Sequence, residues 1–272
     1  MDNLTSGLDL NRIINSVFTR CAIFVFSLGL LAAVDIQANR IMLDADSIYP
    51  FLIMLLTPAS LALKLGVQAI TIIRRCCVPI GVFICALNII AIITNMSEPS
   101  DYFEGQRLLY APAALGIILS LLCRLIEPTG NFNFRLSKSE LFAFYLIFLG
   151  CTVASSTLIL GADTPISSAW NSQAALIAIT VWAICIAHPE FSNLTLYERT
   201  KKASLGIILV SAISGVSLWT FIIATRDLEA FGSIFAVPVI GFLNGSWLAI
   251  FATSVSASEK RQETEDKFLT GT

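Results

Sequence analysis

Long apolar runs separated by short polar segments repeat along the whole chain. A helix needs about 20 mostly apolar residues to cross the roughly 30 Å hydrocarbon core of a bilayer. Eight runs reach or approach this length, at residues 18–36, 48–65, 76–94, 108–126, 141–160, 170–187, 203–224 and 231–255. None of them alternates between apolar and polar positions, which indicates helices rather than the strands of a membrane barrel. The sequence therefore predicts an all-α, polytopic transmembrane helical bundle of about eight spans. An alternative for the second run is one longer, tilted helix that continues to Ile73.

Basic residues divide the predicted loops into two sets. With the N-terminus inside, 14 of the 17 Lys and Arg residues fall at inner positions, and only Arg40, Arg107 and Arg226 fall at outer ones. Because positive charge in short loops stays on the cytoplasmic side, this alternation predicts that both termini are cytoplasmic. Adding or removing one span would destroy the alternation. We expect an integral membrane protein of the bacterial cytoplasmic (inner) membrane.

The composition agrees with a membrane protein and excludes some function classes. Hydrophobic residues make up 56% of the 272 residues and charged residues 13%, compared with roughly 25% charged in soluble domains. The net charge of −2 gives no reason to expect a nucleic-acid partner. The seven cysteines lie in or beside apolar runs without a C-x-x-C pair, and there is one histidine, so we expect neither a metal site nor a cofactor. The expected partners are the lipid bilayer and either other membrane subunits or further copies of the chain.

The two halves of the chain resemble each other weakly. Residues 43–47 and 160–164 share the pattern Leu-x-Ala-Asp-Ser/Thr. The other paired markers are Arg74-Arg75 and Lys201-Lys202, then Gly81 and Gly206, then Pro112 and Pro238. These markers predict a single transmembrane domain, 1–255, built as a 4+4 parallel repeat of halves 1–130 and 131–255, with a cytoplasmic tail at 256–272. The competing interpretation is coincidence, because basic inner loops and acidic outer loops recur in any chain that obeys charge topology.

Neutral polar residues, rather than charged ones, lie in the middle of the predicted spans. The candidate polar path consists of Asn88, Ser155, Ser211, Ser214 and Asn244. Such groups either line a solute path or join helices through hydrogen bonds of about 0.6–2 kcal/mol, and the sequence leaves both interpretations open. The motif from Gly241 to Gly245 is G-x-x-x-G, which permits close approach of two helices.

A second candidate group is predicted at the cytoplasmic face. It consists of Arg124, Glu127, His188 and Glu190. A histidine beside a carboxylate can act as a general acid or base, although no second histidine or nucleophile stands at a known spacing. The motifs of nucleotide-binding loops, zinc proteases and serine hydrolases are absent from the sequence.

Three functions follow from these patterns, in descending order of support. The first is a permease or transporter for a small or amphipathic solute, favoured by the repeat and by the neutral polar residues. The second is a non-catalytic membrane subunit that anchors or assembles a larger complex. The third is an intramembrane enzyme that acts on a lipid-linked substrate with the cytoplasmic-face residues. The sequence favours a non-enzymatic role without deciding the question.

Overall fold

The computed structural model of this chain describes residues 45–95, 99–127, 136–161, 171–225 and 231–256, with single positions between 22 and 29. Every regular element in these ranges is a helix, as predicted. The elements are α3 (Ala45–Ser60), α4 (Ala62–Leu65), the 3-10 helix η1 (Gly66–Gln68), α5 (Ala69–Asn95), α6 (Pro99–Ile126), α7 (Lys138–Leu160), α8 (Ser172–Ala187), the 3-10 helix η3 (Pro189–Phe191), α9 (Leu196–Thr225) and α10 (Phe231–Ser256).

Four helical stretches are long and apolar enough to cross a membrane. They are Ile48–Thr94, which runs from the first turn of α3 to the last turn of α5, and Lys138–Leu160, Leu196–Leu218 and Ala236–Val255. Two shorter apolar helices, Ala111–Ile126 and Ser172–Ala187, accompany them. These lengths and compositions are those of an integral helical membrane protein. The helices coincide with the second to eighth predicted spans, whereas the first predicted span and the C-terminal tail fall largely outside the described residues. The total of eight spans therefore stays a prediction.

The chain reverses direction between α3 and α5. Gly66 has a φ of 56°, a left-handed conformation that favours glycine, and it begins η1 between the two helices. The alternative of one tilted helix continuing to Ile73 is therefore wrong, because the helix that starts at residue 45 stops at Ser60 and Ile73 belongs to α5. Arg74 and Arg75, expected near an inner loop, lie in the second turn of α5.

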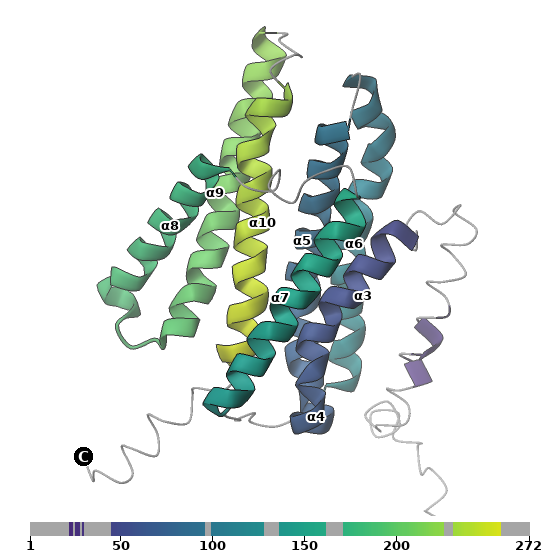
Figure 1. The fold of residues 1–272 in the computed structure, drawn as a ribbon, viewed down its shortest axis with the longest axis vertical. Helices are drawn as coiled ribbons and strands as arrows, with labels where there is room; N and C mark the ends of the chain where they lie inside the picture. The colour runs from purple at the N-terminus through teal and green to yellow at the C-terminus, as the bar shows by residue number, and fades with distance from the viewer. Residues whose placement is uncertain are drawn as a thin grey trace, which may run out of the picture.

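Successive long helices run in alternating directions, as Figure 1 shows for α3 and for α5 to α10. Helix α5 packs against α3, α6 and α10, and α9 packs against α8 and α10. Helix α7 lies against α3 and α5, although the sequence assigns it to the second half. The contact between α5 and α10 joins the group containing α3, α5, α6 and α7 to the group containing α8, α9 and α10 (Figure 1).

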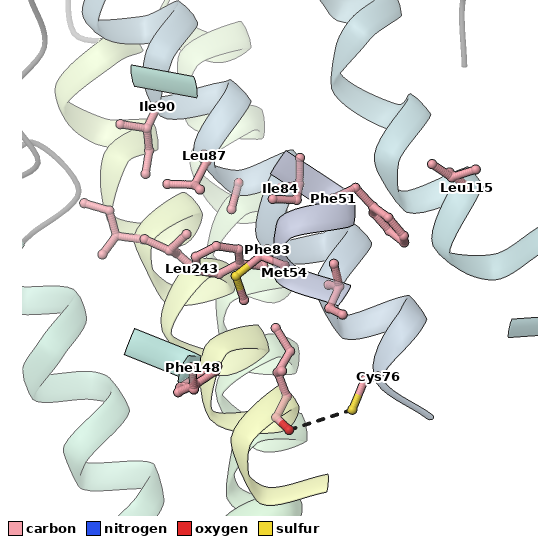
Figure 2. Packing of buried hydrophobic residues seen from close by; sticks show 14 of the residues in the cluster. Phe51, Met54, Cys76, Phe83, Ile84, Leu87, Ile90, Leu115, Phe148 and Leu243 are labelled. Atoms are coloured by element: carbon pink, nitrogen blue, oxygen red, sulfur yellow. Dashed lines mark hydrogen bonds between the residues drawn. The ribbon is translucent and has the colours of Figure 1, made fainter. Parts of the chain in front are cut away.

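Large apolar side chains fill the space where α3, α5, α7 and α10 meet. Phe51 and Met54 from α3 lie beside Ile84 and Leu87 from α5, and all four are buried (Figure 2). Phe148 enters the same cluster from α7. In a bilayer, lipid tails are as apolar as these side chains, so their close packing holds the helices together through dispersion contacts.

Two helix pairs cross so closely that a methyl group added to a glycine at the crossing would collide with the facing helix. A methyl group on Gly116 of α6 would overlap the carbonyl oxygen of Cys77 in α5, and one on Gly81 would overlap the carbonyl oxygen of Pro112. Helices α9 and α10 cross in a similar way. A methyl group on Gly245 would lie 2.7 Å from Cγ1 of Ile208, in agreement with the packing role expected for the G-x-x-x-G motif.

One end of the bundle carries the basic residues that were predicted to lie inside. Helix α4, the beginnings of α5, α7 and α9, and the ends of α6, α8 and α10 lie together at the lower end in Figure 1. We call this the basic end. The described Lys and Arg residues of these helix ends are Lys64, Arg74, Arg75, Arg124, Lys138, Arg199, Lys201 and Lys202. Lys64 Nζ lies 2.6 Å from Glu140 Oε2, and Glu140 also forms a capping box with Ser137, so the pair joins α4 to the start of α7.

Candidate functional site

The three serines of the candidate polar path all donate their hydroxyl hydrogens to backbone carbonyls. Ser155 of α7 is buried and donates to the carbonyl oxygen of Pro50 in α3 at 3.0 Å. Ser211 donates to Ile207 at 2.7 Å, and Ser214 donates to Ser211 at 3.0 Å, both within α9. Ser155 thus joins two helices, and the other two serines satisfy themselves within their own helix.

Ser211 has a second role in packing. A methyl group on Gly241 of α10 would overlap its hydroxyl oxygen, so the small side chain of Ser211 and the absent side chain of Gly241 allow α9 and α10 to meet. The serine stripe of α9 is therefore explained by helix packing at this position. Sequence alone could not separate the two interpretations, because both need a small residue with a hydroxyl.

The two asparagines differ from the serines. Asn88 of α5 and Asn244 of α10 are both half-buried, and they lie on the two helices whose contact joins the groups of the bundle. Neither side-chain amide has a hydrogen-bond partner within the described part of the chain. Each amide offers two donor hydrogens and an acceptor oxygen. These two residues retain the capacity to bind water or a polar solute.

The cytoplasmic-face candidates are divided between two places. Arg124 is exposed in the last turn of α6, and Glu127 follows that helix. His188 and Glu190 lie at the turn between α8 and α9, on the opposite side of the bundle from the end of α6 (Figure 1). The four residues therefore do not form one site.

His188 has a local structural role in this turn. Its Nδ1 accepts a hydrogen bond from the backbone nitrogen of Glu190 at 3.3 Å, and its ring centroid lies 5.4 Å from that of Phe191. His188 caps the short helix η3 while remaining exposed. Among the described residues, neither a nucleophile nor a carboxylate oxygen contacts the imidazole ring of His188.

Glu127 has a partner that the sequence did not indicate. Its Oε2 lies 2.9 Å from Nε of Arg74 in α5, and both side chains are about three-quarters buried, with 20% and 26% exposed. The N–H of Arg74 is not aligned for a hydrogen bond, so the contact is an ion pair. The pair ties the end of α6 to the second turn of α5.

An aromatic cluster links α7 to α10 and is a second feature that sequence reasoning missed. The ring of Phe148 lies 4.8 Å from that of Trp247 and 5.6 Å from that of Phe251. The indole Nε1 of Trp247 donates to Thr152 Oγ1 at 3.2 Å. A sequence signal existed in the aromatic residues near the ends of both spans, but their pairing depends on how α7 crosses α10.

The described residues contain no group of three or more His, Cys, Asp or Glu side chains placed to hold a metal ion. Their six cysteines are free thiols. Thr57, which is fully buried in α3, has a hydroxyl without a hydrogen-bond partner in the described part of the structure. The candidate residues therefore provide neutral amide and hydroxyl groups within the bundle, and ion pairs at its basic end.

No protein-family model matches this sequence, and comparisons with curated proteins and with solved structures gave no significant match.

Proposed function

We propose that this chain is a permease-like membrane protein that moves a small or amphipathic solute through the bundle. The observation that carries the proposal is the pair Asn88 and Asn244, half-buried and without protein partners among the described residues. An amide in an apolar medium costs free energy unless it is hydrogen-bonded. Water or a polar solute between the helices would supply that bond.

The predicted repeat forms part of the proposal. In each half, small residues bring the third and fourth helices together. In the first half, Gly81 meets Pro112 and Gly116 meets Cys77. In the second half, Gly245 meets both Ser204 and Ile208, and Gly241 meets Ser211. The step from Cys77 to Ser204 equals the step from Arg74 to Lys201, so the crossing and the basic pair share one register. Gly206 is not the counterpart of Gly81, because Gly206 faces Val181 of α8.

The topology of eight spans with both termini in the cytoplasm of a bacterium is proposed on the same basis. The basic residues that were predicted to be cytoplasmic lie together at one end of the bundle, which supports this topology. A C-terminal fusion to green fluorescent protein should fluoresce, and an alkaline phosphatase fused after residue 165 should be active outside the cytoplasm. Failure of either fusion would contradict the orientation.

Access of water to the asparagines tests the transport proposal. Asn88→Cys and Asn244→Cys are made in the otherwise unchanged chain, reconstituted in liposomes and treated with the charged thiol reagent MTSET. Mass spectrometry then reads the modification at each introduced cysteine. Two controls are Val216→Cys, at an exposed apolar position of α9, and Ile84→Cys, in the buried core.

We expect labelling at positions 88 and 244 and none at the controls, because MTSET reacts with a hydrated thiolate. If both positions are labelled, a flux assay follows, in which the liposomes are screened with neutral polar and amphipathic radiolabelled solutes. The double variant Asn88→Ala with Asn244→Ala should lower the flux. If positions 88 and 244 stay unlabelled, the path does not exist. Recovery of a stoichiometric partner in mild detergent would then favour the membrane-subunit interpretation.

A further inference from the structure

Three cations from two helices gather at the basic end beside the C-terminal turn of α10. They are Arg75 of α5 and Lys201 and Lys202 of α9, and we call them the basic seam. All three side chains are exposed. Arg75 and Lys201 are close enough to act on each other electrostatically, and Lys202 adds to the charge beside Lys201. The seam lies where the two groups of the bundle meet.

The contact between α5 and α10 fixes this position. The Sγ atom of Cys76 lies 3.4 Å from Oγ of Ser254 and 3.8 Å from the carbonyl oxygen of Ile250. Cys76 is fully buried and directly follows Arg75. Ser204, three residues after Lys201, packs against Gly245 of the same helix α10. The two cations therefore lie on packed helices beside α10 rather than on loops.

Three of the other five cations at this end have partners, whereas Arg124 and Lys138 have no ion pair among the described residues. Arg74 pairs with Glu127 and Lys64 with Glu140. Arg199 donates to one backbone carbonyl at the end of α8 and to two in the turn between α8 and α9.

The basic seam has no ion pair within the described residues. The acid nearest along α9 is Glu198, which offsets part of the charge of Lys201. Its carboxylate also accepts a hydrogen bond from the backbone nitrogen of Thr195 at 3.4 Å, in a capping arrangement. An excess of positive charge is left at the seam.

Exposed apolar surface begins one helical turn beyond each cation. Val78 follows Arg75 by three residues, and Leu205 follows Lys201 by four, so each lies on the same helix face as its cation. Val78 is 36% exposed and Leu205 55% exposed. A cationic group at the end of a membrane helix, with apolar surface directly beyond it, matches a phosphate headgroup and the acyl chains attached to it.

We propose that the basic seam binds the phosphate of an anionic phospholipid, with the acyl chains against Val78 and Leu205. This inference does not depend on transport. A free anion would satisfy the charges but would leave the apolar surface unused. The acidic residues of the tail, beyond Ser256, could occupy the basic seam in place of a lipid, and the test distinguishes these two occupants.

Native mass spectrometry of the full chain in detergent tests the proposal. The probe lipid is dioleoylphosphatidylglycerol, with dioleoylphosphatidylcholine as the neutral reference. The test variant is Arg75→Gln with Lys201→Gln, and the matched control is Arg124→Gln with Lys138→Gln. The control likewise removes one arginine and one lysine from the same end of the bundle, but outside the basic seam. Thermal unfolding of both variants checks that they are folded.

Each cation near a membrane surface contributes about 5-fold to the binding of an anionic lipid, so the test variant should bind phosphatidylglycerol about 30-fold more weakly. The control should change binding by less than about 2-fold, and excess inorganic phosphate should not displace the lipid. Equal losses in both variants would overturn the proposal, because they would show general charge attraction. Displacement by inorganic phosphate would overturn it in favour of a soluble anion. Lipid binding that begins only after residues 257–272 are deleted would show that the tail fills the seam, which also overturns it.

Discussion

Replacing Gly116 by alanine adds one methyl group where α5 and α6 cross. That methyl group would overlap the carbonyl oxygen of Cys77. The carbonyl belongs to a helix backbone and cannot rotate away, so the two helices must separate. Separation weakens the neighbouring contact of Gly81 with Pro112, one turn along the same crossing. The expected result is a less stable protein.

Two opposing terms set the magnitude. Inserting a methyl group into a packed site costs about 1–3 kcal/mol, and alanine gains at most about 1 kcal/mol over glycine within a helix. The net loss should be about 1–2 kcal/mol. Gly150 of α7 is the matched control, because nothing lies within 4 Å of a methyl group added there. Gly150→Ala should be neutral or stabilising by up to about 1 kcal/mol.

Gly245 provides an intermediate case. A methyl group there meets Cγ1 of Ile208 at 2.7 Å and the carbonyl oxygen of Ser204 at 3.1 Å. The side chain of Ile208 can shift, so the cost should lie between those of the other two variants. The order of stability should be Gly150→Ala, then Gly245→Ala, then Gly116→Ala.

The measurement is thermal unfolding of the detergent-solubilised protein, followed by tryptophan fluorescence. Each kcal/mol corresponds to about 2–4 °C for a chain of this size. Gly116→Ala should therefore melt about 2–8 °C below the wild type. Equal melting temperatures for Gly116→Ala and Gly150→Ala would refute the close crossing of α5 and α6.

Substitutions at three other contacts test the candidate site. Trp247→Phe removes the hydrogen bond to Thr152, and a double-mutant cycle with Thr152→Val should give a coupling of about 0.6–1.5 kcal/mol in thermal unfolding; zero coupling would contradict the contact. Arg74→Gln should destabilise the protein by about 1–2 kcal/mol, because it leaves the carboxylate of Glu127, which is about three-quarters buried, without its partner. Adding Glu127→Gln should recover most of that loss, and a failure to recover would mean that the pair does not exist. Ser211→Ala should change stability by less than about 0.5 kcal/mol, since its hydroxyl bonds within its own helix, and a larger fall would assign the hydroxyl a role between helices.

The positions of the helices could be predicted because they follow from a local property. The predicted span 141–160 corresponds to α7 (Lys138–Leu160), and the predicted span 170–187 corresponds to α8 (Ser172–Ala187). Their ends have local causes as well. Gly161 has a φ of 75° after α7, and the side chain of Asn171 caps the backbone nitrogens of Gln173 and Ala174 at the start of α8.

The partners of these helices could not be predicted in the same way. Gly241 and Gly245 form a recognisable motif on α10. On α6, the residue four positions before Gly116 is Pro112 rather than glycine, so no such motif marks that crossing. The pairing of Arg74 with Glu127 depends on how α5 and α6 lie against each other. A serine in a membrane helix is compatible with either packing or solvation, and only the acceptor of its hydroxyl hydrogen decides between them.

The placement of α7 limits how the bundle could move if it transports a solute. Sequence assigns α7 to the second half, yet Ser155 of α7 donates to Pro50 of α3 and the two helices lie together. A rocking motion that separated residues 1–130 from residues 131–255 would break this contact. A boundary between α3–α7 on one side and α8–α10 on the other preserves it. That boundary crosses the contact of α5 with α10 and the aromatic contacts of α7 with α10.

A reversible tether across that contact tests the boundary. Ser254→Cys places a second thiol beside Cys76, whose Sγ lies 3.4 Å from the present Oγ of Ser254. Oxidation with copper phenanthroline should join α5 to α10, and dithiothreitol should release them. If α5 and α10 separate during transport, solute flux falls on oxidation and returns on reduction, while oxidised wild-type protein keeps its flux. Unchanged flux in a chain shown by mass spectrometry to be fully tethered would place the moving boundary elsewhere, because a covalent bond at this point allows α5 and α10 no relative displacement there.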